Sequence, residues 1–189
     1  MKDLDLLSDV MGKTGDLIES VRSDQWDLPT PCRDWDVSEL VGHIVGWLRV
    51  FAAGAAGEAF EGDPADYRAG DGSADDFRRL TAVLVAGWEA NGTDRTVRLT
   101  SGELPGAMVL DMTLMEYLTH GWDLATATGQ PVPFTEVEAE DVLRRARATL
   151  RPEYRGPDTA MGEEVPVPAD APATLRLAAF MGRDVSAGQ

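Results

Sequence analysis

Apolar residues recur every three or four positions along most of this chain, a spacing that predicts amphipathic helices. The first stripe predicts a helix over residues 3–23. Asp36, followed by Glu39 at the third helical position, has the form of a capping box and predicts a second helix over Val37–Ala56. Each stripe gives its helix one face that a shared core can cover.

Two more long helices are expected in the middle of the chain. Ser73 is a good N-cap, and the stripe after it predicts a helix that stops at Asn91-Gly92. A later stripe begins at Leu110 and ends at Gly129, with a proline just beyond. Four long helices joined by loops of mixed length suggest a helical bundle, whose core faces can carry a site.

The segments between the helices are expected to be irregular or extended. Prolines and aspartates make 26–36 a structured connector, and 62–72, rich in Gly, Asp and Pro, a surface loop. Residues 96–100 alternate like a short strand, and 101–106 can return as the second strand of a hairpin. Four prolines between Arg151 and Pro172 predict an irregular wrap there.

Two shorter helices are expected near the C-terminus. Thr135 and Glu138 form a second capping-box pattern, at the start of a helix rich in arginine. A short apolar stripe predicts a final helix over 173–181. The fold class expected is therefore all-α, with a helical bundle over residues 1–150, one short hairpin, and a C-terminal helical extension over 151–189 that packs on the bundle.

Composition excludes several classes of protein. The chain has 189 residues, 33 of them acidic and 17 basic, which gives a formal charge of −16. Such a surface repels nucleic acid and anionic membranes, so neither is expected as a partner. Four aspartates interrupt the N-terminal segment, which argues against a signal peptide. With a single cysteine, the chain is expected in the reducing cytoplasm, as a monomer or a homodimer.

The chain contains only two histidines, and both fall within or beside the apolar stripe of their helix. Glu116 precedes His120 by four residues, so the two side chains share one helix face. His43, from a facing helix, can supply a third ligand. Two histidines and one carboxylate suit Zn²⁺ or another first-row divalent ion and leave room for water or substrate. The alternative is that all three are interior residues satisfied by neighbouring polar groups.

Other residues are candidates for supporting roles at such a centre. Asp123, three residues after His120, can hold an imidazole N–H behind the metal or simply contact solvent. Trp47, one turn after His43, and Trp122 can line a pocket or belong to the core.

A cysteine and a basic patch have simpler interpretations. Cys32 lies in the proline-rich connector with Arg33 as its cationic neighbour, which favours a structural or incidental role over a redox-responsive one. Arg144, Arg145 and Arg147 form a patch that we interpret as a solvated face paired with the acidic surface. Contact with an anionic substrate is the alternative.

Three segments resemble one known family: PTPCRDWDVSELVGHIVGW, MEYLTHGWDLATATGQ and EEVPVPADAPATLRLAAFMGRD. The resemblance covers nearly the whole chain and is to the actinobacterial metal-binding family related to mycothiol-dependent maleylpyruvate isomerase, in the DinB-like (YfiT-like) superfamily. It implies an up-down-down-up four-helix bundle. It also implies a divalent metal, Zn²⁺ first and Ni²⁺ or another first-row ion as alternatives, held by His43, Glu116 and His120. The H-x-x-D-L continuation is matched by His120, Asp123 and Leu124.

The resemblance implies a reaction as well. A metal ion lowers the pKa of a bound thiol, so a low-molecular-weight thiol such as mycothiol would become a nucleophile at neutral pH. We therefore expect a metal-dependent thiol S-transferase or isomerase that acts on a small-molecule substrate. Hydrolysis by metal-bound water and a non-catalytic metal- or ligand-binding bundle are the alternatives. The isomerase carries a sizeable further C-terminal domain that contributes to its active site, whereas in this sequence only about forty residues follow the arginine-rich helix. Maleylpyruvate itself is therefore not the expected substrate.

Overall fold

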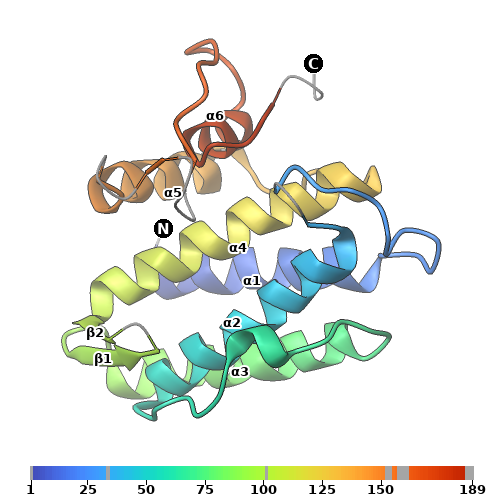
Figure 1. The fold of residues 1–189 in the computed structure, drawn as a ribbon. Helices are drawn as coiled ribbons and strands as arrows, with labels where there is room; N and C mark the ends of the chain where they lie inside the picture. The colour runs from blue at the N-terminus through green and yellow to red at the C-terminus, as the bar shows by residue number, and fades with distance from the viewer. Residues whose placement is uncertain (1, 33–34, 101, 152–154, 157–161, 186–189) are drawn as a thin grey trace.

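Helices dominate the computed structural model, which describes residues 2–32, 35–100, 102–151, 155–156 and 162–185 (Figure 1). The prediction of a mainly helical protein with one short hairpin is confirmed. The elements of the described residues are α1 (Asp3–Glu19), α2 (Val37–Ala56), the 3₁₀ helix η1 (Pro64–Asp66), α3 (Ser73–Asn91), β1 (Thr96–Leu99), β2 (Gly102–Pro105), α4 (Gly106–Thr128), α5 (Glu136–Thr149) and α6 (Ala173–Phe180).

The four long helices share one apolar core. α1 packs against α3 and α4, and α2 packs against the same two helices. α5 and α6 contact each other and lie on α4, on the side away from α2 and α3 (Figure 1). The antiparallel strands β1 and β2 lie at the start of α4. The largest fully buried side chains come from all four long helices and include Trp88, Tyr117, Phe77, Leu6, Leu7, Met11, Leu40 and Ile44.

Both predicted capping boxes are present. The Glu39 backbone N–H donates to Asp36 Oδ1 at 2.8 Å, and the Asp36 N–H donates to Glu39 Oε2 at 3.0 Å. The Glu138 N–H donates to Thr135 Oγ1 at 3.3 Å, and the Thr135 N–H donates to Glu138 Oε2 at 2.7 Å. Because each box satisfies two backbone donors with side chains only three residues away, α2 and α5 begin where the sequence predicts.

Three helix ends differ from the sequence prediction. α1 ends at Glu19 rather than at residue 23, because beyond Ser20 the chain turns into the connector. Ser73 is not the N-cap of α3, a position taken by Gly72; its hydroxyl instead accepts the Gly70 N–H at 2.9 Å. α4 starts at Gly106 rather than Leu110, since β2 runs directly into it and the Gly106 N–H donates to the Arg95 carbonyl at 2.7 Å.

The segment 62–72, expected as a plain surface loop, contains η1 and lies along α2. Two glycines of α2 allow this close approach. A Cβ at Gly46 would stand 2.1 Å from the Pro64 carbonyl oxygen, and one at Gly42 would stand 3.4 Å from the Tyr67 carbonyl oxygen. The Tyr67 hydroxyl donates to Asp76 Oδ2 at 2.9 Å and thereby anchors the loop to α3. The loop is thus held on α2 at a defined place.

We expect Gly46→Ala to destabilise the protein by about 1–3 kcal/mol, the usual cost of overpacking. The added methyl would collide with backbone, so the loop must move off α2. Gly12→Ala is the matched control, because Gly12 is an exposed position within α1 where a Cβ meets nothing within 4 Å. That change should stabilise the protein by up to about 1 kcal/mol. Urea unfolding followed by circular dichroism measures both; equal stabilities would contradict the packing described.

Ion pairs tie α5 to the helices beneath it. Arg145 lies within 2.6 Å of Asp3 Oδ1 and of Asp111 Oδ1, and 3.3 Å from Asp141 Oδ2. Its side chain is only 12% exposed, so the interpretation of this arginine as part of a solvated face is wrong. The local sequence could not show this burial, because the carboxylates that surround Arg145 come from three different helices. The other two arginines of the predicted patch are more than half exposed.

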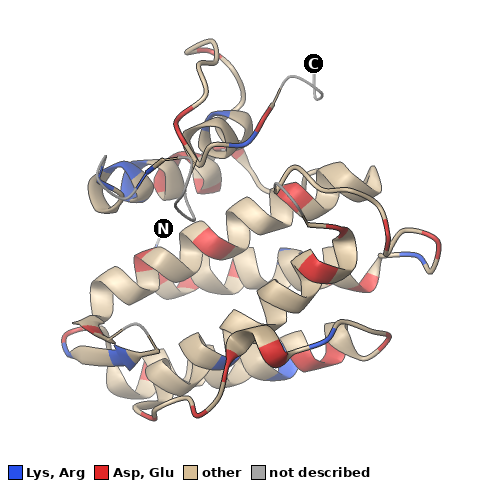
Figure 2. Ribbon diagram, viewed as in Figure 1, with Lys and Arg blue, Asp and Glu red and all other residues tan. Residues whose placement is uncertain are grey.

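Acidic positions occur on every long helix and in most of the loops, whereas basic ones are few, in keeping with the charge of the chain (Figure 2). Among the described residues, none of the helices combines the length and the apolar character that crossing a membrane requires.

Candidate metal centre

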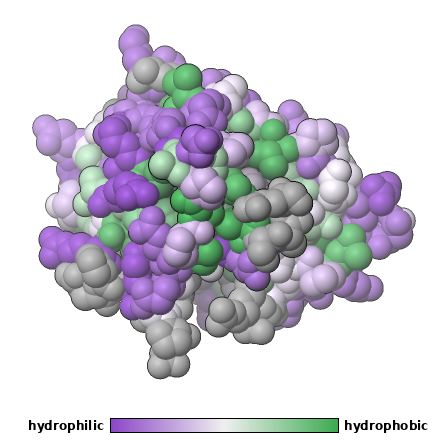
Figure 3. All heavy atoms as spheres, turned by 90° about the horizontal axis from the view of Figure 1, so that it is seen from above, coloured by the Kyte–Doolittle hydropathy of each residue, from purple (hydrophilic) through white to green (hydrophobic). Residues whose placement is uncertain are grey.

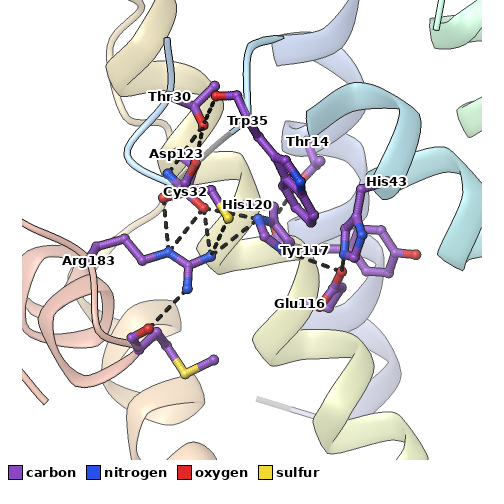
Figure 4. A network of polar contacts seen from close by, with 11 residues as sticks. Thr14, Thr30, Cys32, Trp35, His43, Glu116, Tyr117, His120, Asp123 and Arg183 are labelled. Carbon is purple, nitrogen blue, oxygen red and sulfur yellow. Dashed lines mark hydrogen bonds and ion pairs between the residues drawn. The ribbon is translucent and has the colours of Figure 1, made fainter. Parts of the chain in front are cut away.

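The three predicted ligands come together between α2 and α4. His43 Nε2 lies 2.6 Å from Glu116 Oε1, and His120 Nε2 lies 3.4 Å from the same oxygen (Figure 4). One donor atom from each residue lies within 4.8 Å of the other two. The His43 side chain is 23% exposed and that of His120 only 8%, so the cluster is reached from the His43 side.

One hydrogen bond between α4 and α2, next to the cluster, fixes the register of these two helices. The Tyr117 hydroxyl donates to the Ile44 carbonyl oxygen at 3.3 Å. Tyr117 follows Glu116 and Ile44 follows His43, so this single bond aligns the two parts of the cluster. Burial and the charge of Glu116 raise the pKa of Tyr117 well above its usual range, which keeps the phenol neutral and able to donate.

Glu116 is ionised at neutral pH. Burial by itself would raise the pKa of Glu116, but the charge of His120 and the hydrogen bond with His43 outweigh burial and lower the pKa to about 2. A carboxylate is the form that binds a metal ion. The cluster therefore offers one anionic oxygen beside two imidazoles.

Behind His120 lies a buried ion pair. His120 Nδ1 is 3.0 Å from Asp123 Oδ2, and Arg183 Nη2 donates to the same oxygen at 2.9 Å (Figure 4). Asp123 is fully buried; burial would raise its pKa, but the hydrogen bond from His120 and the charge of Arg183 lower it. An ionised Asp123 favours a proton on His120 Nδ1. A proton on Nδ1 makes Nε2, which lies 3.4 Å from Glu116 Oε1, the nitrogen that would lose its own proton to bind a metal.

Arg183 is the residue that the sequence analysis missed. It follows α6, is 7% exposed, and also donates to the Met181 carbonyl at 3.0 Å. The only signal in the sequence was that it falls within the third segment of the family resemblance. No local pattern could have shown that it reaches Asp123, sixty residues earlier in the chain.

Cys32 has a cationic neighbour that was not expected. Arg183 Nη2 lies 3.7 Å from Cys32 Sγ, whereas Arg33 was the only cationic neighbour expected from the sequence. Cys32, His120 and Asp123 form a second group whose donor atoms lie within 4.8 Å of one another. The guanidinium of Arg183 already occupies this side, and its charge opposes a cation there. The group that includes His43 and Glu116 is therefore the better candidate for a metal.

The donor set fits a zinc-like ion. At the usual zinc bond lengths, donors of a tetrahedral centre lie about 3.3 Å apart. The pair His120–Glu116, at 3.4 Å, already has that separation. The pair His43–Glu116, at 2.6 Å, must open by less than about 1 Å. Three protein ligands leave a coordination position for water, thiol or substrate. That these residues bind a metal stays a prediction.

The two tryptophans predicted to line a pocket lie at two different pockets. Trp47 lies beside a cavity of about 630 Å³ next to His43, which is also lined by Trp35. Trp122 lies instead at a separate hollow of about 520 Å³, between the end of α4 and the residues before α6. The face that carries the C-terminal helices has hydrophobic residues at its centre, surrounded by hydrophilic ones (Figure 3). Of these two pockets, only the cavity beside Trp47 adjoins the cluster, through His43.

Fold and cluster together define a class: a helical protein that brings together two histidines and a glutamate from facing helices, with one of the histidines lining an open cavity. The chain belongs to the mycothiol maleylpyruvate isomerase N-terminal domain family, whose profile matches residues 7–125.

Two relatives in sequence support this assignment. The uncharacterized proteins MT0763 and Rv0738 of Mycobacterium tuberculosis, from strains CDC 1551 / Oshkosh and H37Rv, are each 36% identical over 171 residues, which cover 89% of this chain and 91% of theirs. Crystal structures of the mycothiol-dependent maleylpyruvate isomerase have the same fold. A histidine-to-alanine mutant of it has a TM-score of 0.62 at 15% identity, and a second structure has 0.57 at 16%; each comparison covers 80% of this chain and 69% of the other.

Proposed function

We propose that this protein is a metal-dependent thiol S-transferase or isomerase that uses a mycothiol-type thiol as cosubstrate. His43, Glu116 and His120 would hold the metal, Zn²⁺ in the first place. The observation that carries the proposal is their convergence, with one ionised carboxylate, next to a cavity of about 630 Å³ that His43 lines. Membership of a family named for a mycothiol-dependent isomerase supports the thiol.

A bound divalent ion would supply the positive charge that holds a thiol as its thiolate at neutral pH. Glu116 is the only anionic ligand in the proposed set, so it neutralises only part of that charge. Asp123 accepts the hydrogen bond of His120 Nδ1 and so orients the ring, and Arg183 holds the Asp123 carboxylate in place. The ring of Trp35 packs against that of His43, with 4.5 Å between the ring centroids.

The nucleophile itself is best supplied from outside the chain. The single cysteine, Cys32, lies beside Arg183, on the Nδ1 side of His120 and away from His43 and Glu116 (Figure 4). Both histidines of the chain belong to the proposed centre, which leaves no third imidazole to act as a general base. A thiol activated by direct ligation needs no such base, and this supports a thiol cosubstrate over a protein nucleophile.

For the arrangement of the helices we propose the DinB-like up-down-down-up four-helix bundle, formed by α1 to α4. The packing of α1 and of α2 each against α3 and α4 supports it. The likeness to the solved isomerase structures, at a TM-score of 0.62, supports it as well.

A chlorobimane assay tests the proposed function. The Cys32→Ser variant, loaded with Zn²⁺, is the starting protein, so that the reagent cannot alkylate the chain's own thiol. We expect consumption of the bimane to require both mycothiol and metal, and to be lost when His43→Ala is added. Hydrolysis of test esters without any thiol would instead support water as the nucleophile. Absence of both reactions, with Zn²⁺ bound, would support a non-catalytic binding protein.

A further inference from the structure

The hollow of about 520 Å³ beside Trp122 is separate from the cluster of histidines and glutamate. Trp122 and Thr126 line it from α4, Val132 from the connection between α4 and α5, and Leu175 from α6. Its volume is in the range of small-molecule sites, which often form between helices. None of the three proposed metal ligands lines it, so a ligand bound here would not need the metal.

Hydrogen bonds hold the segment before α6, which forms one wall of the hollow, in place. Both carboxylate oxygens of Glu136, at the start of α5, accept the Ala173 N–H at 3.0 Å. Arg176 Nε donates to the Ala171 carbonyl oxygen at 2.8 Å, and the Ala171 N–H donates to the Pro168 carbonyl oxygen at 3.1 Å. This wall is therefore formed before any ligand arrives, which lowers the entropic cost of binding.

A single charged residue, Asp170, belongs to the lining of the hollow. Its side chain is exposed, and within the described part of the chain no hydrogen bond or ion pair engages its carboxylate. Arg176, the nearest arginine in sequence, does not neutralise it, because Arg176 forms ion pairs with Glu136 and Glu140 of α5. The hollow therefore presents one negative charge that no basic side chain balances.

The rest of the lining is mainly apolar. Trp122, Val132, Leu175 and two prolines provide most of it. Tryptophan is the aromatic side chain that attracts cations most strongly, and apolar walls favour a ligand with a ring or a hydrocarbon body. The net charge of −16 draws cations toward the whole surface and repels anions. The complement of this lining is an apolar molecule that carries one positive charge.

We propose that the hollow is a second binding site, which takes a small organic cation: a protonated amine on an apolar ring. The ring would pack against Trp122 and Leu175, and the ammonium group would pair with Asp170. This site goes beyond the proposed function, because it requires neither a metal nor a thiol.

Isothermal titration calorimetry with three probes of similar shape tests this proposal. The probes are 2-(1-naphthyl)ethylamine, 2-(1-naphthyl)ethanol and 1-naphthylacetate, which are cationic, neutral and anionic at neutral pH. At about 0.15 M salt, which screens general attraction to the acidic surface, we expect the amine to bind saturably with a Kd of about 1 mM or lower. The alcohol should bind at least about threefold more weakly, and the acetate more weakly still. Treatment of the protein with a chelator should change none of these constants.

Variants place the probe in the hollow. Asp170→Asn should reduce the affinity for the amine to that for the alcohol, whereas Glu89→Gln, which removes an exposed carboxylate of α3 outside the hollow, should leave it unchanged. Thr126→Phe fills the hollow from an exposed position of α4 and should weaken binding of the amine and the alcohol by at least about tenfold. Trp47→Ala, in the cavity beside His43, should weaken neither. Circular dichroism checks that each variant is folded.

Three results would overturn the second site. The first is a titration in which the amine shows no saturable binding. The second is an equal effect of Asp170→Asn and Glu89→Gln, which would reduce the preference for the amine to general attraction by an acidic protein. The third is binding that Trp47→Ala abolishes and Thr126→Phe does not, which would place the probe in the cavity beside His43. None of these results bears on the proposed function, which the chlorobimane assay tests separately.

Discussion

His43→Ala is expected to lower the affinity for Zn²⁺ by at least about tenfold, because it removes one of three proposed ligands. Mutation of a residue that only hydrogen-bonds to a metal ligand already lowers metal affinity by about that factor. Glu116 and His120 remain on α4, but one helix turn offers only two donors. Competition with a chromophoric chelator measures the affinity, and elemental analysis of the purified proteins checks the metal content.

Ser38→Ala is the matched control for this loss. Ser38 lies near the start of the same helix and lines the same cavity, yet it contributes no proposed ligand. Its affinity for Zn²⁺ should equal that of the unchanged protein. A His43→Ala protein that binds Zn²⁺ as tightly as Ser38→Ala would remove the basis of the proposed centre.

Arg183→Met is expected to destabilise the protein by about 3–5 kcal/mol, the usual cost of leaving one partner of a buried ion pair without the other. Asp123 has 0% exposure and receives the Nη2 and Nε donors of Arg183 at 2.9 and 3.2 Å. The affinity for Zn²⁺ should fall as well, since the carboxylate that orients His120 loses its cation. Urea unfolding measures the first effect and chelator competition the second.

Two further variants test whether the loss of stability comes from the orphaned charge. Asp123→Asn in the Arg183→Met background removes the orphaned charge and should recover part of the lost stability, which a double-mutant cycle quantifies. Arg98→Met, at an exposed position of β1, should change the stability by less than about 0.5 kcal/mol. If the two arginine variants were equally stable, the ion pair would not hold α6 to α4 in solution.

Local patterns predicted the helices well where their determinants lie within one turn. Asp36 with Glu39, and Thr135 with Glu138, satisfy backbone groups of their own helix, so the start of α2 and of α5 could be located from sequence. The start of α4 could not, because its first N–H bonds to Arg95, beyond the hairpin. Ser73 failed as an N-cap for a similar reason, since its hydroxyl serves the preceding loop.

The proposed ligands were predicted from spacing, scarcity and a family resemblance together. Glu116 and His120 share a helix face by their spacing alone. That His43 meets them depends on the packing of α2 against α4, and spacing within one helix carries no information on that contact. The positions of Trp47 and Trp122 show the same limit, because both are aromatic residues near a histidine and yet they line different pockets.

The amino-acid sequence is therefore sufficient for the helical character, the two capping boxes, the acidic surface and the shared helix face of Glu116 and His120. Each of these depends on residue types and on neighbours within a few positions. Tertiary structure was needed for the ion pair of Arg183 with Asp123, the burial of Arg145, and the cavity beside His43. The physical reason is that these features form between segments far apart in the chain, where packing alone determines which charges and rings meet.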